Sequence, residues 1–213
     1  MELLKLDIFL NLSIIIPALV GMYVFKSISK AYRYFIIITC AGALHEYNAE
    51  FQFAPYFITD LVYSLCSTQL ILLLYFNWDF KKTAKYKKMM MHLITFILVL
   101  SDQYYDFISS YHIRWGMIAS MVGISLYSIR LLTQSHNNTI SARESFSRKL
   151  IIIPYMVFSV YFAAISILMQ FLFSKVTQPL FMDLFNVIRW INFLSYITYT
   201  LALLWAPKKE QFL

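Results

Sequence analysis

An arginine lies within the last apolar stretch of the sequence, where a helix in contact with lipid would not hold one. Arg189 is about 12 Å inside the nearer end of this stretch, Leu180–Trp205, at a rise of about 1.5 Å per residue. A guanidinium keeps its charge in proteins, and an unpaired one inside a bilayer would cost at least a few kcal/mol. We therefore expect a carboxylate partner, with Glu46 as the first choice and Asp102 as the second.

Arg189 belongs to a polar stripe that repeats at intervals of three and four residues with Asn186, Asn192 and Tyr196. This spacing places the four residues on one face of a helix, which we expect to face the interior of a bundle. Such a face can hold an anionic or polar group. The predicted ligand-binding residues are Arg189, Glu46, Asp102, His45, Asn186, Asn192, Asp60 and Tyr105.

The sequence contains no recognisable catalytic or metal-binding set. Asp102 and Glu46 could act as a general acid and base, but no nucleophile motif accompanies them. Of the four histidines, only His45 and His112 lie on the side that carries most of the acids, so no three-histidine zinc site is formed there. We expect neither metal nor cofactor.

The composition indicates a membrane protein. Of 213 residues, 60% are hydrophobic and 14% are charged, whereas a soluble domain is about half apolar and a quarter charged. A spanning helix needs about 20 mostly apolar residues, and we predict one all-α transmembrane domain of seven helices over residues 1–213. The predicted spans are Ile8–Phe25, Tyr32–Glu50, Tyr56–Phe76, Met89–Tyr105, Ile113–Leu132, Leu150–Phe173 and Leu180–Trp205.

The basic residues predict the orientation of these spans. Most of the 18 lysines and arginines fall in the first, third and fifth connections and in the C-terminal tail, whereas Lys5, Arg114 and Lys175 lie on the other side. Cytoplasmic loops carry the excess of Lys and Arg, so we expect an outer N-terminus and a cytoplasmic C-terminus in the plasma (inner) membrane. Orientation in the membrane thus explains the net charge of +7, and we do not expect nucleic acid as a partner. The basic loops, the longest of them over Arg143–Lys149, are expected to contact a membrane or cytoplasmic protein.

Most of the 11 acids lie on the predicted outer side or in the outer half of a span, whereas the cytoplasmic half is nearly free of charge. This distribution predicts an outward-facing polar cavity around Arg189. The alternative is a buried Arg–Glu pair that only fixes helix packing.

Short matches between the two halves of the sequence are consistent with a repeat of three helices, a linker helix and three more. Pro55 precedes the third predicted span as Pro179 precedes the seventh. Spans one to three and five to seven would run in the same direction, which defines a parallel repeat. Chance matching of short apolar strings is the alternative.

The function we predict is a receptor-like or sensor-like module that binds a small polar or amphiphilic ligand in the outer half of the bilayer. A small-solute or proton-coupled transporter is an alternative, disfavoured by the uncharged inner half unless hydroxyls and water complete its path. A lipid-modifying hydrolase and a subunit of a membrane assembly are further alternatives.

Overall fold

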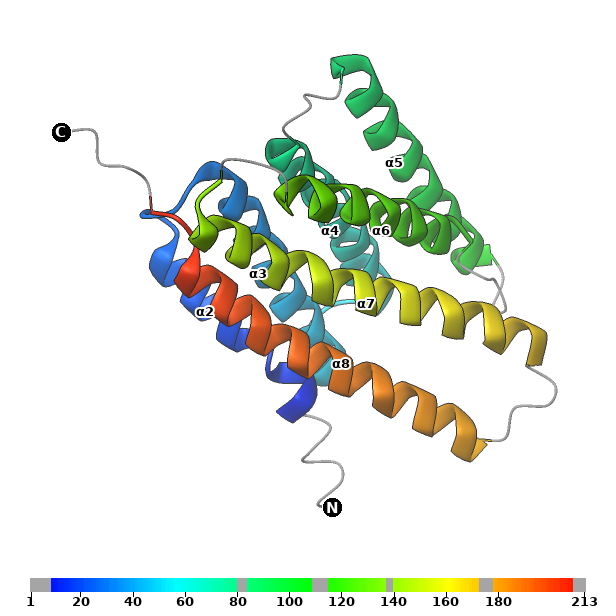
Figure 1. Ribbon diagram of the computed structural model, residues 1–213. Helices are drawn as coiled ribbons and strands as arrows, with labels where there is room; N and C mark the ends of the chain where they lie inside the picture. Colours follow the sequence, from blue (N-terminus) through cyan, green and yellow to red (C-terminus); the bar gives the residue numbers. More distant parts are fainter. Residues whose placement is uncertain (1–8, 80–83, 109–114, 137–139, 173–177, 209–213) are drawn as a thin grey trace.

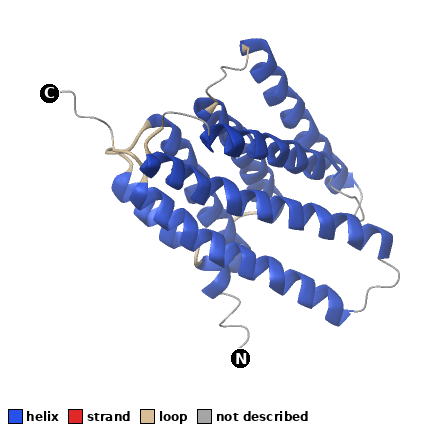
Figure 2. Ribbon diagram, viewed as in Figure 1, coloured by secondary structure: helices blue, strands red, loops and turns tan. Residues whose placement is uncertain are grey.

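The computed structural model describes residues 9–79, 84–108, 115–136, 140–172 and 178–208, and these are nearly all helical, without a β-strand among them (Figure 2). The bounds of the helices follow the predicted spans within a few residues at most ends. The named helices are α2 (Ile15–Val24), α3 (Lys30–Phe51), α4 (Tyr56–Trp78), α5 (Lys85–Ile108), α6 (Trp115–His136), α7 (Ala142–Leu172) and α8 (Gln178–Trp205).

Four helices in the described part of the chain are long and apolar enough to cross a membrane: α4, α6, α7 and α8. A shorter apolar stretch covers Phe9–Val24. Many large apolar side chains on these helices are exposed, among them Val62, Leu126, Val160 and Leu194. An outer surface this apolar is what a bilayer requires of a spanning bundle.

The expected basic loop over Arg143–Lys149 is helical instead, because α7 begins at Ala142. Ser141 starts the helix by accepting the Glu144 N–H at its hydroxyl, 3.2 Å away, which satisfies one of the free amides of the first turn. Glu144 then accepts hydrogen bonds from the Arg148 guanidinium one turn later. These polar residues therefore extend an apolar helix rather than interrupt it.

Six helices form a closed ring, and α5 lies outside it. Along the ring, α2 packs on α3, α3 on α4, α4 on α6, α6 on α7, α7 on α8, and α8 on α2. The remaining helix, α5, packs across α4 and α6 at the edge of the bundle (Figure 1). The C-terminal ends of α2, α4, α6 and α8 lie on the same side of the bundle as the N-terminal ends of α3, α5 and α7. The lysine-rich connections therefore gather on this side, here called the basic end. The opposite end is called the acidic end.

The largest apolar core lies toward the basic end. Its fully buried members include Tyr32 of α3, Tyr75 of α4, Ile151 of α7 and Leu203 of α8. The ring is thus closed most tightly on the side where the sequence predicts the cytoplasm.

Candidate functional site

A polar turn between α3 and α4 builds one wall of the acidic end. The buried Asn48 side chain donates to the Thr59 hydroxyl at 2.9 Å and accepts the Ala54 N–H at 2.8 Å. Gln52 ends α3 in the left-handed region, with φ of 50°. These bonds hold the last turn of α3 against the first turns of α4.

This turn brings together two of the predicted site residues, His45 and Asp60. The Nε2 atom of His45 lies 3.9 Å from an oxygen of the buried Asp60 carboxylate. The His45 ring stacks on that of Tyr63, with centroids 4.8 Å apart and planes inclined by 10°. Aromatic and carboxylate neighbours on α4 therefore fix the imidazole.

Arg189 and Glu46 also lie close enough to interact electrostatically. Arg189 donates a hydrogen bond of 3.1 Å to the side-chain amide oxygen of Asn186, one turn earlier on α8. Glu46 in turn interacts electrostatically with the phenols of Tyr63 and Tyr196. Electrostatic interactions thus link Glu46 to both Arg189 and Tyr196. The predicted stripe does not face the interior along its whole length, because Asn186 is exposed.

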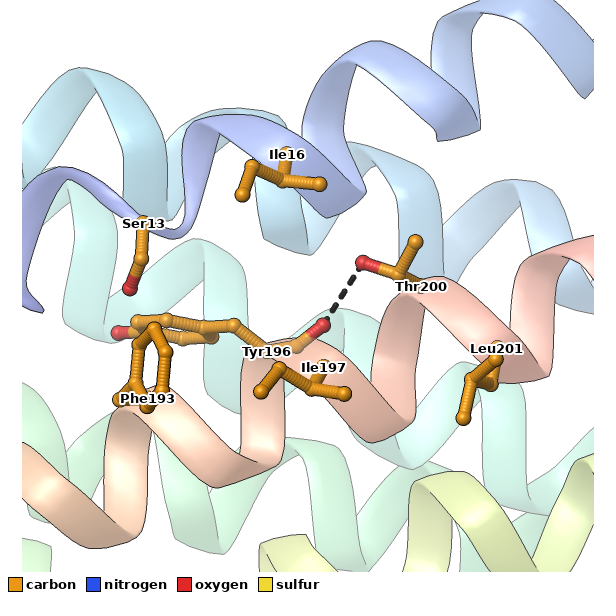
Figure 3. Close-up of a pocket in the computed structure, with 7 residues that line it drawn as sticks. All are labelled: Ser13, Ile16, Phe193, Tyr196, Ile197, Thr200 and Leu201. Atoms are coloured by element: carbon orange, nitrogen blue, oxygen red, sulfur yellow. Dashed lines mark hydrogen bonds between the residues drawn. The ribbon is translucent and has the colours of Figure 1, made fainter.

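An apolar groove begins next to this polar cluster, between the stretch of residues 9–24 and α8 (Figure 3). Pro17 lacks an N–H group, and the first stretch is helical over residues 9–12, turns at Ser13 and Ile14, and resumes as α2. The groove has a volume of about 220 Å³. It is lined by Ser13, Ile16, Phe193, Tyr196, Ile197, Thr200 and Leu201.

The serine and threonine hydroxyls of this groove are turned to backbone. Ser13 donates to the Leu10 carbonyl at 2.5 Å and Thr200 to the Tyr196 carbonyl at 2.8 Å (Figure 3). Ile16, Ile197 and Leu201 are each about half exposed. The groove therefore presents an apolar surface that is open to the side of the bundle.

Arg189 is on the same face of α8 as the groove. Phe193, Tyr196 and Thr200 follow it at intervals of four, seven and eleven residues, which is the spacing of one helix face. Asn186 precedes it by one turn on this face. The groove therefore ends, toward the acidic end, at a guanidinium and an amide.

The structure does not bring Asp102 to this site. Asp102 is buried on α5, and its oxygens accept the N–H groups of Gly116 at 2.9 Å and Met117 at 2.5 Å. These amides are in the first turn of α6, so Asp102 caps a neighbouring helix, where a negative charge is favourable. Its helix packs on α4 and α6, whereas α8 packs on α7 and α2.

Replacing Asp102 with alanine is expected to lower the free energy of unfolding by about 1–2 kcal/mol, because two amides of the first turn of α6 lose their acceptor. Chemical unfolding in detergent measures this loss. Asp183→Ala is the matched control, since Asp183 is exposed on α8. Equal stabilities of the two variants would contradict the capping role.

Two other predicted site residues have no defined place in the cluster. Asn192 is half-buried on α8, on the stripe that contains Arg189. Tyr105 is in α5, and its side chain lies outside the described residues.

A second polar cluster, at the basic end, was missed by the sequence prediction. Asp79 follows the last residue of α4, and its side chain is fully buried. Its carboxylate accepts the Tyr127 hydroxyl at 2.7 Å and lies 3.3 Å from the Arg130 guanidinium. The sequence signal was weak because Asp79 directly precedes a lysine-rich connection, where an acid suggests a solvated loop.

Arg148 completes this second cluster from α7. Its guanidinium is buried, donates to the Trp78 carbonyl at 3.3 Å, and lies 5.3 Å from the centre of the Trp78 ring. The next residue toward the start of α7, Ser147, donates to the Ala202 carbonyl of α8 at 2.8 Å. The cluster joins α4, α6, α7 and α8, so charge is buried in both halves of the bundle rather than mainly in the outer one.

Together these features define a helical protein with several helices suited to crossing a membrane and with polar clusters at both ends of its ring. No family model, curated protein or solved structure matches the chain.

Proposed function

We propose that this protein is a membrane binding module for a single-chain anionic amphiphile, which enters the groove between α2 and α8 from the side. The observation that carries this proposal is the continuity of the apolar groove with Arg189 on one face of α8. The ligand's anionic head lies at Arg189 and Asn186, and its tail lies along Phe193 to Leu201. The module is receptor-like, because the bound state is passed to a protein partner at the basic end.

The head is recognised by charge. A guanidinium offers a planar set of donors that suits a carboxylate or phosphate, and the Asn186 amide lies 3.1 Å from it. Glu46 is the resting counter-charge, since it interacts electrostatically with Arg189. An incoming anion replaces Glu46 as the partner of Arg189.

The tail is selected by shape rather than by the hydrophobic effect. Lipid chains are as apolar as the groove, so moving a chain from bilayer to groove gains little free energy. The volume of about 220 Å³ is below that of a typical drug-sized pocket, about 300–1,000 Å³. The lined part of α8 from Phe193 to Leu201 is about 12 Å long. These dimensions favour one chain and assign most of the affinity to the head.

The proposal includes the orientation expected from the sequence, with seven spans, an outer N-terminus and the basic end in the cytoplasm of a plasma-membrane protein. The lysines of the basic end support it, because cytoplasmic loops are enriched in them. In this orientation the groove lies beside the middle of the bilayer. The charged head of the ligand, at Arg189 and Asn186, lies in the outer half.

The parallel repeat is part of the same proposal. We can exchange the first three helices of the ring, α2, α3 and α4, with the last three, α6, α7 and α8. Each pair of packed neighbours then becomes another pair of packed neighbours. The contact of α4 with α6, for example, becomes the contact of α8 with α2. The alignment of Pro55 with Pro179 pairs Tyr75 with Tyr199, each 20 residues further on. These two phenols are buried and interact electrostatically. A linker helix outside the ring, as α5 is, fits this arrangement.

Fluorescence quenching tests the binding proposal. Trp190 is half-exposed, and its ring centroid lies 5.9 Å from that of Phe193, which lines the end of the groove nearest Arg189. A fatty acid brominated near its carboxylate should quench the protein in nanodiscs, and Trp190→Phe should remove most of that quenching. Arg189→Gln should weaken binding by about ten- to a hundredfold, because it removes a charged hydrogen-bond donor.

Arg143→Gln is the matched control, because Arg143 is an exposed arginine at the basic end. The brominated alcohol of the same chain length controls for the charge of the head, and competition by an anionic phospholipid distinguishes one chain from two. Equal affinities of the acid and the alcohol, or of Arg189→Gln and the unaltered protein, would overturn the proposal.

A further inference from the structure

A set of tyrosines occupies the interior of the six-helix ring. Tyr75 of α4 packs on Tyr127 of α6 and Tyr155 of α7, with ring centroids 6.2 and 6.4 Å apart. Tyr199 of α8 interacts electrostatically with Tyr75, Tyr155 and Tyr63. Since α4 and α8 are not neighbours along the ring, phenols from both must meet across its centre.

This phenol cluster reaches the acidic end through Tyr63. The Tyr63 ring stacks on His45, which lies 3.9 Å from Asp60. The Tyr63 hydroxyl interacts electrostatically with Glu46, Asp60 and Tyr155. Two carboxylates and an imidazole therefore lie at this end of the cluster.

At the other end, the cluster reaches the buried carboxylate of Asp79. Tyr127 donates its hydroxyl to Asp79 at 2.7 Å. Ser128, the next residue on α6, donates to the Tyr75 hydroxyl at 3.0 Å. Phenols and a serine thus extend between carboxylates at opposite ends of the bundle.

A phenylalanine would fill nearly the same space as each tyrosine without the cost of burying a hydroxyl. A hydroxyl, however, both donates and accepts a hydrogen bond. In pumps and transporters, chains of Asp, Glu and His side chains relay protons through the membrane, and a hydroxyl between such groups can pass a proton on in the same way. Repeated use of tyrosine at these interior positions favours conduction over packing.

We propose that the interior phenols form a proton path between Asp60 at the acidic end and Asp79 at the basic end. A proton binds the Asp60 carboxylate, and the resulting acid donates it to the chain of hydroxyls. Each hydroxyl accepts one proton and releases its own to the next oxygen, so every O–H bond broken is replaced by a new one. Where neighbouring phenols are not in direct contact, a bridging water carries the transfer.

The last hydroxyl, that of Tyr127, delivers its proton to the Asp79 carboxylate, which releases it at the basic end. One proton disappears from one side and one appears on the other, and the proton gradient across the membrane drives the transfer. No oxidant, reductant or second substrate takes part. This inference does not depend on the amphiphile site, because the groove lies on the face of α8 that is turned away from the interior of the ring.

Proton uptake by proteoliposomes tests this path. The full chain is reconstituted in vesicles with a trapped pH-sensitive dye, and a potassium gradient with valinomycin supplies the membrane potential. The unaltered protein should acidify the lumen faster than empty vesicles. Tyr155→Phe should slow this by about tenfold or more, because it removes one proton-transferring group and little volume.

Tyr32→Phe is the matched control, since Tyr32 is a fully buried phenol of the basic end outside the path. Tyr75→Phe is a second test variant, and circular dichroism shows that each variant is folded. A rate equal to that of empty vesicles would overturn the inference. So would equal rates for folded Tyr155→Phe, Tyr75→Phe and Tyr32→Phe proteins.

Discussion

Replacing Arg130 with alanine should lower the free energy of unfolding by about 2–3 kcal/mol, which is less than for a fully buried ion pair because the arginine is partly exposed. The Asp79 side chain is fully buried, whereas that of Arg130 is 43% exposed. Loss of the guanidinium therefore leaves the negative charge inside the protein. Asp79 also follows the C-terminal end of α4, where the helix dipole disfavours an acid.

A second substitution shows whether charge is the cause. Asp79→Asn in the Arg130→Ala background removes the buried negative charge and retains an oxygen for the Tyr127 hydroxyl. The double variant should therefore be more stable than Arg130→Ala alone. Such non-additive effects are expected for two residues in contact. Chemical unfolding in detergent, followed by tryptophan fluorescence, measures both.

Arg143→Ala is the control for Arg130→Ala, because Arg143 is an exposed arginine at the same end. Its effect should stay within about 0.5 kcal/mol. Equal effects of the two alanine variants, or no recovery in the double variant, would show that this pair does not stabilise the basic end.

The second large effect is expected at the contact between α5 and α6. A Cβ atom added at Gly116 would clash with the carbonyl oxygen of Leu98 and would lie 3.1 Å from a carboxylate oxygen of Asp102. A backbone carbonyl in a helix cannot rotate away, so Gly116→Ala must push the two helices apart. We expect a loss of about 1–3 kcal/mol from overpacking, with further loss from the displaced Asp102 cap.

Gly123 provides a control on the same helix, because a Cβ atom there would meet nothing within 4 Å. Alanine is the better helix former by about 1 kcal/mol, so Gly123→Ala should be neutral or stabilising. The expected thermal-unfolding result is a lower midpoint for Gly116→Ala and an equal or higher midpoint for Gly123→Ala. A stabilising Gly116→Ala would contradict the close helix approach.

The helix bounds follow from the sequence because apolar runs of about 20 residues are long signals that local polar residues rarely disturb. The largest difference is at the start of α7, where Ser141, Glu144 and Arg148 favour a helix through a cap and a pair one turn apart. Hydropathy alone assigns such residues to a loop. The physical signal was present in the residue types and their spacing.

The site was predictable only in part. The depth of Arg189 indicates a nearby carboxylate, and Glu46 does interact with it electrostatically. Asp102 lies at a similar depth but caps α6, because depth does not identify which helices are neighbours. The groove forms where α8 packs on α2, and the Asp79 cluster forms where the end of α4 meets α6. Both join elements far apart in the sequence, so neither follows from local pattern.

Photocrosslinking tests the central claim most directly. A fatty acid with a diazirine in its chain would be bound to the protein in nanodiscs, activated by light, and mapped by mass spectrometry of the digested protein. We expect labelling to be concentrated on Phe193–Leu201 and Ser13–Ile16, and to be strongly reduced in Arg189→Gln but not in Arg143→Gln. Labelling spread evenly over the exposed apolar faces, and unchanged by Arg189→Gln, would contradict it.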